Sequence, residues 1–141
     1  MPGKKVNLAM ATVLETLRLN QSEALVRRVL ENITFDGWGI PKGRFLRACI
    51  REGHRDPAVF PDPDRFDPQR FIGRKYGPDE YSPFGFDHHH CIAGDLVVQL
   101  SSILVEELVH GFCWEVLADG PCQRGPFHWG PAAAFAIRLA R

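Results

Sequence analysis

One cysteine of this chain stands where a thiolate could do chemistry. Residues 84–94 read Phe-Gly-Phe-Asp-His-His-His-Cys-Ile-Ala-Gly, and an apolar stretch over residues 95–112 follows at once. We predict a helix over that stretch, which places Cys91 beside the positive end of the helix dipole. A cysteine in such a field loses its proton easily, so it suits the role of a metal ligand or a nucleophile.

Three interpretations of Cys91 stay open from the residues alone. It is a buried, inert cysteine, or a zinc ligand together with His88, His89 and His90, or the single thiolate ligand of a haem iron. Zinc sites usually combine pairs such as C-x-x-C and H-x-x-x-H, and the chain has no C-x-x-C. Three adjacent histidines also point in different directions, which argues against zinc.

A second group with chemical character is the E-x-x-R pair Glu15 and Arg18. It lies within residues 7–20, where apolar residues recur at the three- and four-residue spacing of a helix. An exposed ion pair of this kind contributes little to stability. Apolar neighbours on both sides indicate that the pair is at least partly buried, where each charge needs further partners.

Composition narrows the class of protein. The 141 residues suit one domain with a sizeable core, and 17 basic residues balance 17 acidic ones. This balance favours neither nucleic acid nor an anionic membrane surface as a partner. No secretory leader and no apolar run long enough to span a bilayer is evident, so we expect a cytoplasmic location.

The remaining elements predict an α+β fold. Asp36-Gly37 between apolar residues indicates a type I′ hairpin over residues 32–40, and Pro41-Lys42-Gly43 a second turn. We expect residues 21–28 to be irregular and residues 44–51 to form a strand with Phe45 and Ile50 in the core. Residues 114–117 and 135–139 read as closing strands, joined by a turn region over residues 120–131. The helix over residues 95–112 is apolar nearly all round and is expected to be buried.

A proline-rich coil separates the sheet from the Cys91 loop. Asp56 and Pro57 are typical of the start of a helical turn, and the prolines that follow prevent regular structure. Phe60, Phe66 and Phe71 are expected to pin this coil by being buried.

Together these motifs resemble the cytochrome P-450 haem-thiolate family, over roughly residues 8–141. Phe84, Gly85, His89 and Cys91 fit its ligand loop, although Asp87, His89 and Ala93 replace the usual Gly, Arg and Gly. The E-x-x-R helix, the hairpin with its I-P-K-G turn, and H-R-D-P at residues 54–57 are also similar. Residues 66–71 resemble its F-x-P-x-R-F element, which implies that Arg70, with Arg65 as rival, joins Glu15 and Arg18 in a Glu-Arg-Arg network.

The resemblance implies a single partial domain over residues 1–141, equivalent to the C-terminal portion of the P-450 fold. Haem b would be the cofactor and Cys91 its iron ligand. The cofactor-binding residues that the family pattern implies are Cys91, Phe84, Gly85 and Ala93 in the loop, and His89 and Arg28 toward the propionates. Phe127, His128 and Trp129 are candidates for a substrate pocket.

The function that this implies is a segment of a monooxygenase acting on an unknown organic substrate, completed by the missing N-terminal part. The family's oxygen-activating helix and distal helices have no counterpart here, so whether this chain is itself an enzyme stays open. The alternatives are a non-catalytic haem- or partner-binding remnant and a peroxide-using variant. Expected partners are haem, a chain or domain supplying the distal half or a second copy, and a redox partner. We also expect apolar surface to be exposed in the isolated chain.

Overall fold

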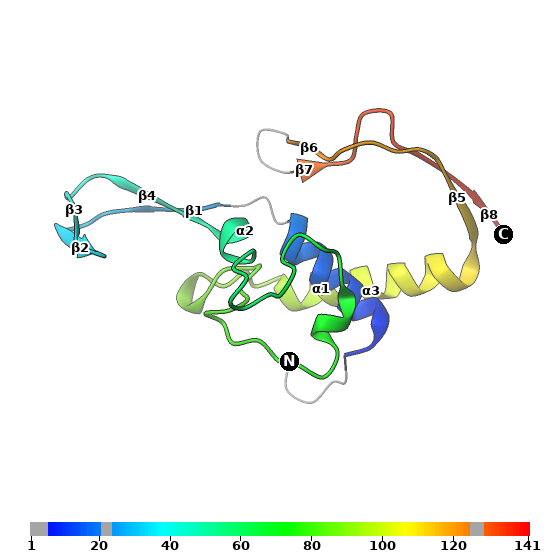
Figure 1. Ribbon diagram of the computed structural model, residues 1–141, viewed down its shortest axis with the longest axis horizontal. Coiled ribbons are helices and arrows are strands. Elements are labelled where there is room, and N and C mark those ends of the chain that lie inside the picture. Colours follow the sequence, from blue (N-terminus) through cyan, green and yellow to red (C-terminus); the bar gives the residue numbers. More distant parts are fainter. Residues whose placement is uncertain (1–5, 21–23, 125–128) are drawn as a thin grey trace.

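The computed structural model describes residues 6–20, 24–124 and 129–141. A central body holds α1 (Leu8–Asn20), α2 (Ile50–Gly53), two short 3₁₀ turns, η1 (Pro68–Phe71) and η2 (Asp87–His89), and the long helix α3 (Gly94–Gly111). Two antiparallel arms extend from this body on opposite sides (Figure 1). The predicted α+β fold is confirmed. None of the described helices is long and apolar enough to cross a membrane.

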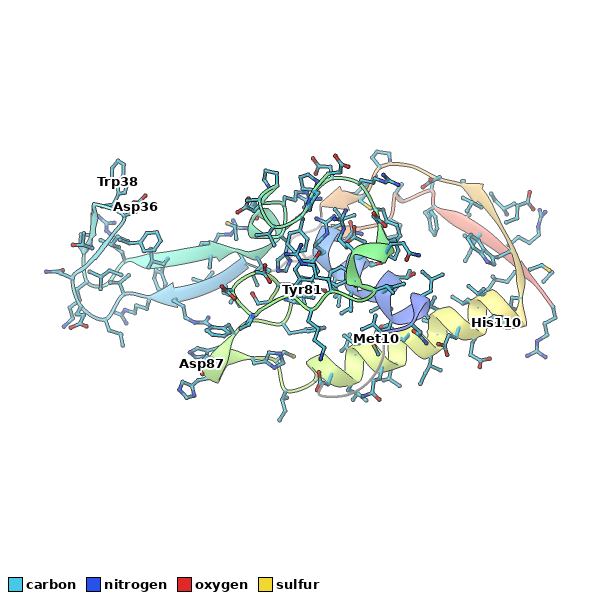
Figure 2. The ribbon with its side chains drawn as sticks, turned by 60° about the horizontal axis from the view of Figure 1, so that its bottom comes forward. Met10, Asp36, Trp38, Tyr81, Asp87 and His110 are labelled. Carbon is cyan, nitrogen blue, oxygen red and sulfur yellow. The ribbon has the colours of Figure 1, made fainter. Side chains whose placement is uncertain are left out.

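The first arm is a long strand pair with a hairpin at its tip. β1 (Ala24–Arg28) pairs with β4 (Phe45–Cys49), and β2 (Ile33–Phe35) pairs with β3 (Trp38–Ile40). Asp36 and Gly37 both have positive φ, 47° and 79°, so the predicted type I′ turn is confirmed. Figure 2 shows Asp36 and Trp38 at the far tip of this arm.

The expectation of irregular structure over residues 21–28 is wrong where the structure describes it. Residues 24–28 form β1, because β4 supplies a pairing partner that lies far away in the sequence. Residues 21–23 are outside the described part. The strand predicted over residues 44–51 ends at Cys49, and Ile50 begins α2 instead. Phe45 is 71% exposed rather than in the core, because β4 is exposed along its whole length in the described chain.

The second arm follows α3. β5 (Cys113–Ala118) pairs with β8 (Ala136–Ala140), with a register shift between Val116 and Ala118. Beyond it, β6 (Gln123–Arg124) pairs with β7 (Trp129–Gly130). The two predicted closing strands are confirmed.

The core lies where α1 packs between α3 and the coil. Met10 and Val13 of α1 contact Val98 of α3, and Figure 2 shows Met10 beside that helix. On its other side, Ala11 packs on Phe60 and Phe71 of the coil. Asn7 caps α1, because its Oδ1 accepts a hydrogen bond from Met10 N at 2.9 Å.

Two expectations about burial are wrong. The long helix was expected to be buried nearly all round. In the structure, only Gly94, Val98 and Ser102 of α3 are buried, and they form one narrow i, i+4, i+8 stripe along the helix. Leu100 and Leu104 are 57% and 59% exposed, in line with the expected exposed apolar surface. In the coil, Phe60 and Phe71 are buried as predicted, but Phe66 is 50% exposed and lies outside the cluster that those two form with Ala11.

Candidate functional site

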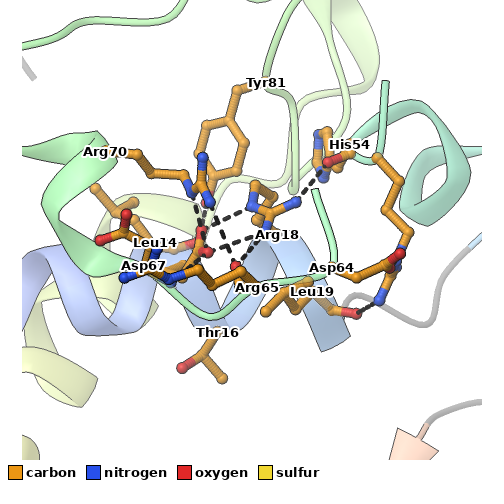
Figure 3. A network of polar contacts seen from close by, with 12 residues as sticks. Leu14, Thr16, Arg18, Leu19, His54, Asp64, Arg65, Asp67, Arg70 and Tyr81 are labelled. Carbon is orange, nitrogen blue, oxygen red and sulfur yellow. Dashed lines mark hydrogen bonds and ion pairs between the residues drawn. The ribbon is translucent and has the colours of Figure 1, made fainter. Parts of the chain in front are cut away.

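A buried ion network joins α1 to the coil (Figure 3). Glu15 and Arg18 have no exposed side-chain surface. Arg18 Nε donates to Glu15 Oε2 at 2.7 Å, and Arg18 Nη2 donates to Glu15 Oε1 at 2.9 Å. This two-point pairing matches the planar guanidinium to the carboxylate, which is the strong geometry for a buried ion pair.

Arg70 is the third member of this network. Its Nε donates to Glu15 Oε1 at 3.1 Å, and its side chain is only 7% exposed. Arg65, the rival from sequence, contributes its backbone instead: its carbonyl oxygen accepts from Arg18 Nη2 and from Arg70 Nη2, each at 3.3 Å. The expected meeting of Glu15, Arg18 and Arg70 is thus present in the structure.

Backbone groups complete the hydrogen bonding of these charges. Asp67 N donates to Glu15 Oε1 at 2.9 Å, and the carbonyls of His54 and Pro61 accept from Arg18 and Arg70. Buried charges are stable only when such partners surround them. The network therefore fixes the path of the coil against α1.

A second set of contacts ties the next segment of the chain to the same place. Tyr81 Oη donates to the Leu14 carbonyl at 2.7 Å, and Ser82 N donates to Nε2 of His54 at 3.0 Å. Burial, and then the positive charges of Arg18 and Arg55, lower the pKa of His54 from 6.5 to about 4. Burial, and then the Glu15 carboxylate, raise the pKa of Tyr81.

The Cys91 loop follows this segment and has a defined backbone. Cys91 N donates to the Phe84 carbonyl at 2.9 Å, and Gly94 N donates to the Cys91 carbonyl at 3.0 Å. Gly85 has a φ of +81°, and a Cβ there would lie 3.1 Å from the His89 carbonyl oxygen. Glycine is thus required at Gly85.

Asp87 occupies a position where the family pattern usually has a glycine. Its φ is +52°, in the left-handed region. Asp is among the residue types that adopt this conformation most readily, because its short polar side chain fits there. Asp87 thus adopts a left-handed conformation that a glycine at this position would also accept.

Cys91 itself is exposed, which excludes the buried, inert interpretation for the chain as it stands. The next residue, Ile92, is fully exposed, and Phe86 is 59% exposed. No three His, Cys, Asp or Glu side chains gather into a metal site within the described residues. An accessible thiol on a fixed loop, flanked by exposed apolar side chains, fits a flat apolar group whose metal takes one sulfur ligand.

Three of the other predicted cofactor-binding residues, Phe84, His89 and Ala93, lie in or next to the Cys91 loop. Phe84 is half-buried and packs against α3, since a Cβ on Gly94 would lie 3.0 Å from its ring. Ala93 is the N-cap residue of α3, and His89 ends η2 with its side chain exposed. Phe127 and His128 lie outside the described residues, as does the side chain of Trp129.

Arg28 ends strand β1, which begins close to the loop. A Cβ on Gly85 would lie 3.8 Å from Cδ1 of Leu25, so β1 passes beside Gly85. Arg28 is three residues further along and exposed, and its side chain makes no hydrogen bond or ion pair within the described chain. Its guanidinium is thus available to a ligand.

Sequence reasoning missed the roles of His54 and Tyr81 in this arrangement. The signal for His54 was the H-R-D-P match itself, which marked the residue without showing what its ring contacts. Tyr81 lies in a loop without a motif, and only its position against α1 shows its contact with Leu14.

Comparisons with known proteins agree with this geometry. A family model described as Cytochrome P450 matches residues 4–127. Luvungin A synthase of Citrus sinensis is 32% identical over 138 residues, which cover 96% of this chain and 29% of that protein. Abscisic acid 8'-hydroxylase of Solanum lycopersicum is 35% identical over 126 residues, covering 88% of this chain and 26% of that protein.

Solved structures show the same fold. The retinoic acid-bound cyanobacterial CYP120A1 matches with a TM-score of 0.81 at 24% identity, covering 94% of this chain and 32% of that one. The cytochrome P450DA heme domain matches with a TM-score of 0.82 at 22% identity, covering 97% and 32%. The chain thus spans less than a third of the curated relatives just named. On the family match and the order of its motifs, this chain belongs to the cytochrome P450 family.

Proposed function

We propose that this chain binds haem b through the Cys91 thiolate and forms the ligand-bearing part of a haem-thiolate oxidoreductase that monooxygenates an organic substrate. Members of the cytochrome P450 family bind haem b. The observation that carries the proposal is the Cys91 loop: an exposed thiol, held by the Cys91–Phe84 backbone bond and the left-handed Gly85, at the entry to α3.

Residues of the loop and of β1 would share the work of binding. Cys91 supplies the sulfur ligand, and Phe84, Gly85 and Ala93 shape the loop around it. Arg28 would neutralise a propionate from β1. His89 would do so less reliably than an arginine, because its charge depends on pH. When bound, a haem with a thiolate ligand supplies oxygen chemistry, since the sulfur donates electron density to the iron.

The ion network would act structurally rather than in the chemistry. Glu15, Arg18 and Arg70 fix the coil, and the coil leads through Tyr81 into the loop. Backbone N–H groups near Gly94 would further tune the sulfur by hydrogen bonding. Loss of the network is therefore expected to disorder the Cys91 loop and not to change the chemistry of the Cys91 sulfur directly.

A partner that supplies the distal half would complete the site. Exposed apolar side chains of α3 support this proposal, namely Leu96, Leu100, Ile103, Leu104 and Val109. Apolar surface of this extent marks an interaction site. A chain spanning less than a third of the relatives it matches leaves such surface for the remaining part of the domain. The alternative is that a second copy of this chain covers the apolar face of α3. Measuring the mass of the protein in solution distinguishes such a dimer from a chain that awaits a different partner.

An absorption spectrum of the purified chain with added haem tests the proposal. The reduced carbon-monoxide complex should show the strong red shift that thiolate ligation produces, and Cys91→Ala should lose it. Cys49→Ala is the matched control, since Cys49 is also exposed but lies in β4. A histidine-type spectrum that persists in Cys91→Ala would overturn the assignment of the ligand.

Two further outcomes separate the alternatives. No haem uptake, even with the distal segment of a relative added, would support a non-catalytic remnant. Turnover with added peroxide and without an electron donor would instead identify a peroxide-using variant.

A further inference from the structure

His54 lies between the buried ion network and the segment that leads into the Cys91 loop. It is 3% exposed, although it belongs to a coil. Its carbonyl oxygen accepts from Arg18 Nη1 at 2.8 Å, while its ring nitrogen Nε2 accepts from the Ser82 amide at 3.0 Å. One residue therefore contacts both parts of the site.

The hydrogen bond from Ser82 fixes the state of the imidazole ring. An Nε2 that accepts a hydrogen bond carries no proton, so the neutral ring must hold its proton on Nδ1. Nδ1 is buried and has no partner within the described part of the chain. An unpaired buried donor costs free energy, so packing alone gives no reason for a histidine here.

The bond to Ser82 reaches Cys91 through the backbone. The Ser82 carbonyl accepts from Gly85 N at 3.1 Å, which starts the turn of the loop. Phe84 then offers its carbonyl to the Cys91 amide at 2.9 Å. Ser82 is thus anchored by its N–H to His54 and by its C=O to the loop, and the position of Cys91 depends on both.

We propose that His54 is a positioning residue for the Cys91 loop, acting as a neutral acceptor that holds the Ser82 amide and joins the loop to the Glu15–Arg18 network. The inference rests on the proposed function, in which Cys91 is the haem ligand. His54 itself touches no reacting group.

Protonation of His54 would release this contact. The imidazolium has no acceptor left for Ser82 N, and it would place a new positive charge beside Arg18 of α1 and the adjacent Arg55. Tyr81, whose ring centroid lies 4.9 Å from that of His54, is neutral and offers no compensating charge.

Two substitutions separate the hydrogen bond from the packing of the ring. His54→Phe keeps a ring against Tyr81 and Phe60 but has no acceptor. His54→Gln loses the ring but carries an amide oxygen that can reach the place of Nε2. NMR on the chain without haem measures the hydrogen-exchange rates of the individual backbone amides of Ser82 and Cys91. The exchange rates of the amides in β5 and β8 report on the rest of the fold.

In His54→Phe we expect Ser82 to exchange roughly tenfold faster, the effect of losing one hydrogen bond. Cys91 should follow in the same direction, while β5 and β8 stay unchanged, and His54→Gln should restore both amides. Unchanged exchange at Ser82 in His54→Phe would overturn the inference. Equal acceleration of exchange at all amides in both variants would also overturn the inference, because it would show that His54 stabilises the whole fold and not the loop in particular.

The haem spectrum supplies a separate readout. His54→Phe should lower the share of bound haem with the thiolate signature, and His54→Gln should recover it. A wild-type chain that takes up no haem would count against the proposed function, whereas amide exchange at Ser82 and Cys91 still decides whether His54 holds the loop.

Discussion

Replacing Glu15 by glutamine tests whether the buried network holds this fold together. The Glu15 carboxylate accepts from both Arg18 and Arg70, and it also accepts from the Asp67 amide. Glutamine keeps the size of the side chain but removes the charge. Both guanidiniums would then remain buried without a counter-ion inside the network.

The expected cost is large compared with the stability of a small domain. Breaking a buried ion pair from one side costs about 3–5 kcal/mol. Whole domains have free energies of unfolding of only about 5–15 kcal/mol. Glu15→Gln should therefore remove about a fifth or more of the stability of the chain.

Glu115→Gln is the matched control. Glu115 accepts from Arg138 at 2.9 Å, a distance like those around Glu15, but the two side chains are 63% and 65% exposed. Exposed pairs of this kind contribute about 1 kcal/mol or less, so the control should remain near wild type.

Urea unfolding, followed by the circular dichroism of the helices, measures both variants against wild type. A Glu15→Gln variant within about 1 kcal/mol of Glu115→Gln would refute the reasoning, because solvent would then be compensating the two arginines. If Glu15→Gln does not fold well enough for its stability to be measured, Arg70→Gln gives a second measurement. Its effect should be smaller, because the Arg70 side chain is partly exposed whereas that of Glu15 is not.

Further predictions concern α3, His54 and the exposed apolar face. Gly94→Ala should destabilise the chain by about 1–3 kcal/mol because its Cβ would press on the Phe84 ring, whereas Gly111→Ala, with open space, should be neutral or stabilising in urea unfolding. The pKa of His54 is lower in the folded state, so the unfolded state binds more protons between pH 6.5 and about 4, and the free energy of unfolding should fall as the pH falls through that window. His54 should account for up to about 3 kcal/mol of this fall in the free energy of unfolding, so the fall should be smaller in His54→Gln. An equal fall in His54→Gln and wild type would contradict the prediction. Leu100→Gln, on the exposed face of α3, should reduce binding of a hydrophobic dye and self-association measured by light scattering, and unchanged values would contradict an interaction role for that face.

The sequence alone determined the elements whose signals are local. The Asp36-Gly37 turn follows from the few residues that accept positive φ, and α1 follows from apolar spacing after Asn7. The Cys91 loop is recognisable in the sequence because Gly85 and Cys91 occupy the places that the family pattern requires, and the F-x-P-x-R-F resemblance favours Arg70 over Arg65.

Only the tertiary structure decided the features that depend on distant partners. Residues 24–28 form a strand because β4 pairs with them, and α3 is largely exposed because its buried residues Gly94, Val98 and Ser102 form a single stripe, where α1 and the Phe84 segment pack. The role of His54 depends on Ser82, which lies 28 residues further along the chain. Local propensity and apolar pattern are properties of neighbouring residues, whereas pairing, burial and the protonation of a ring depend on which side chains the fold brings together.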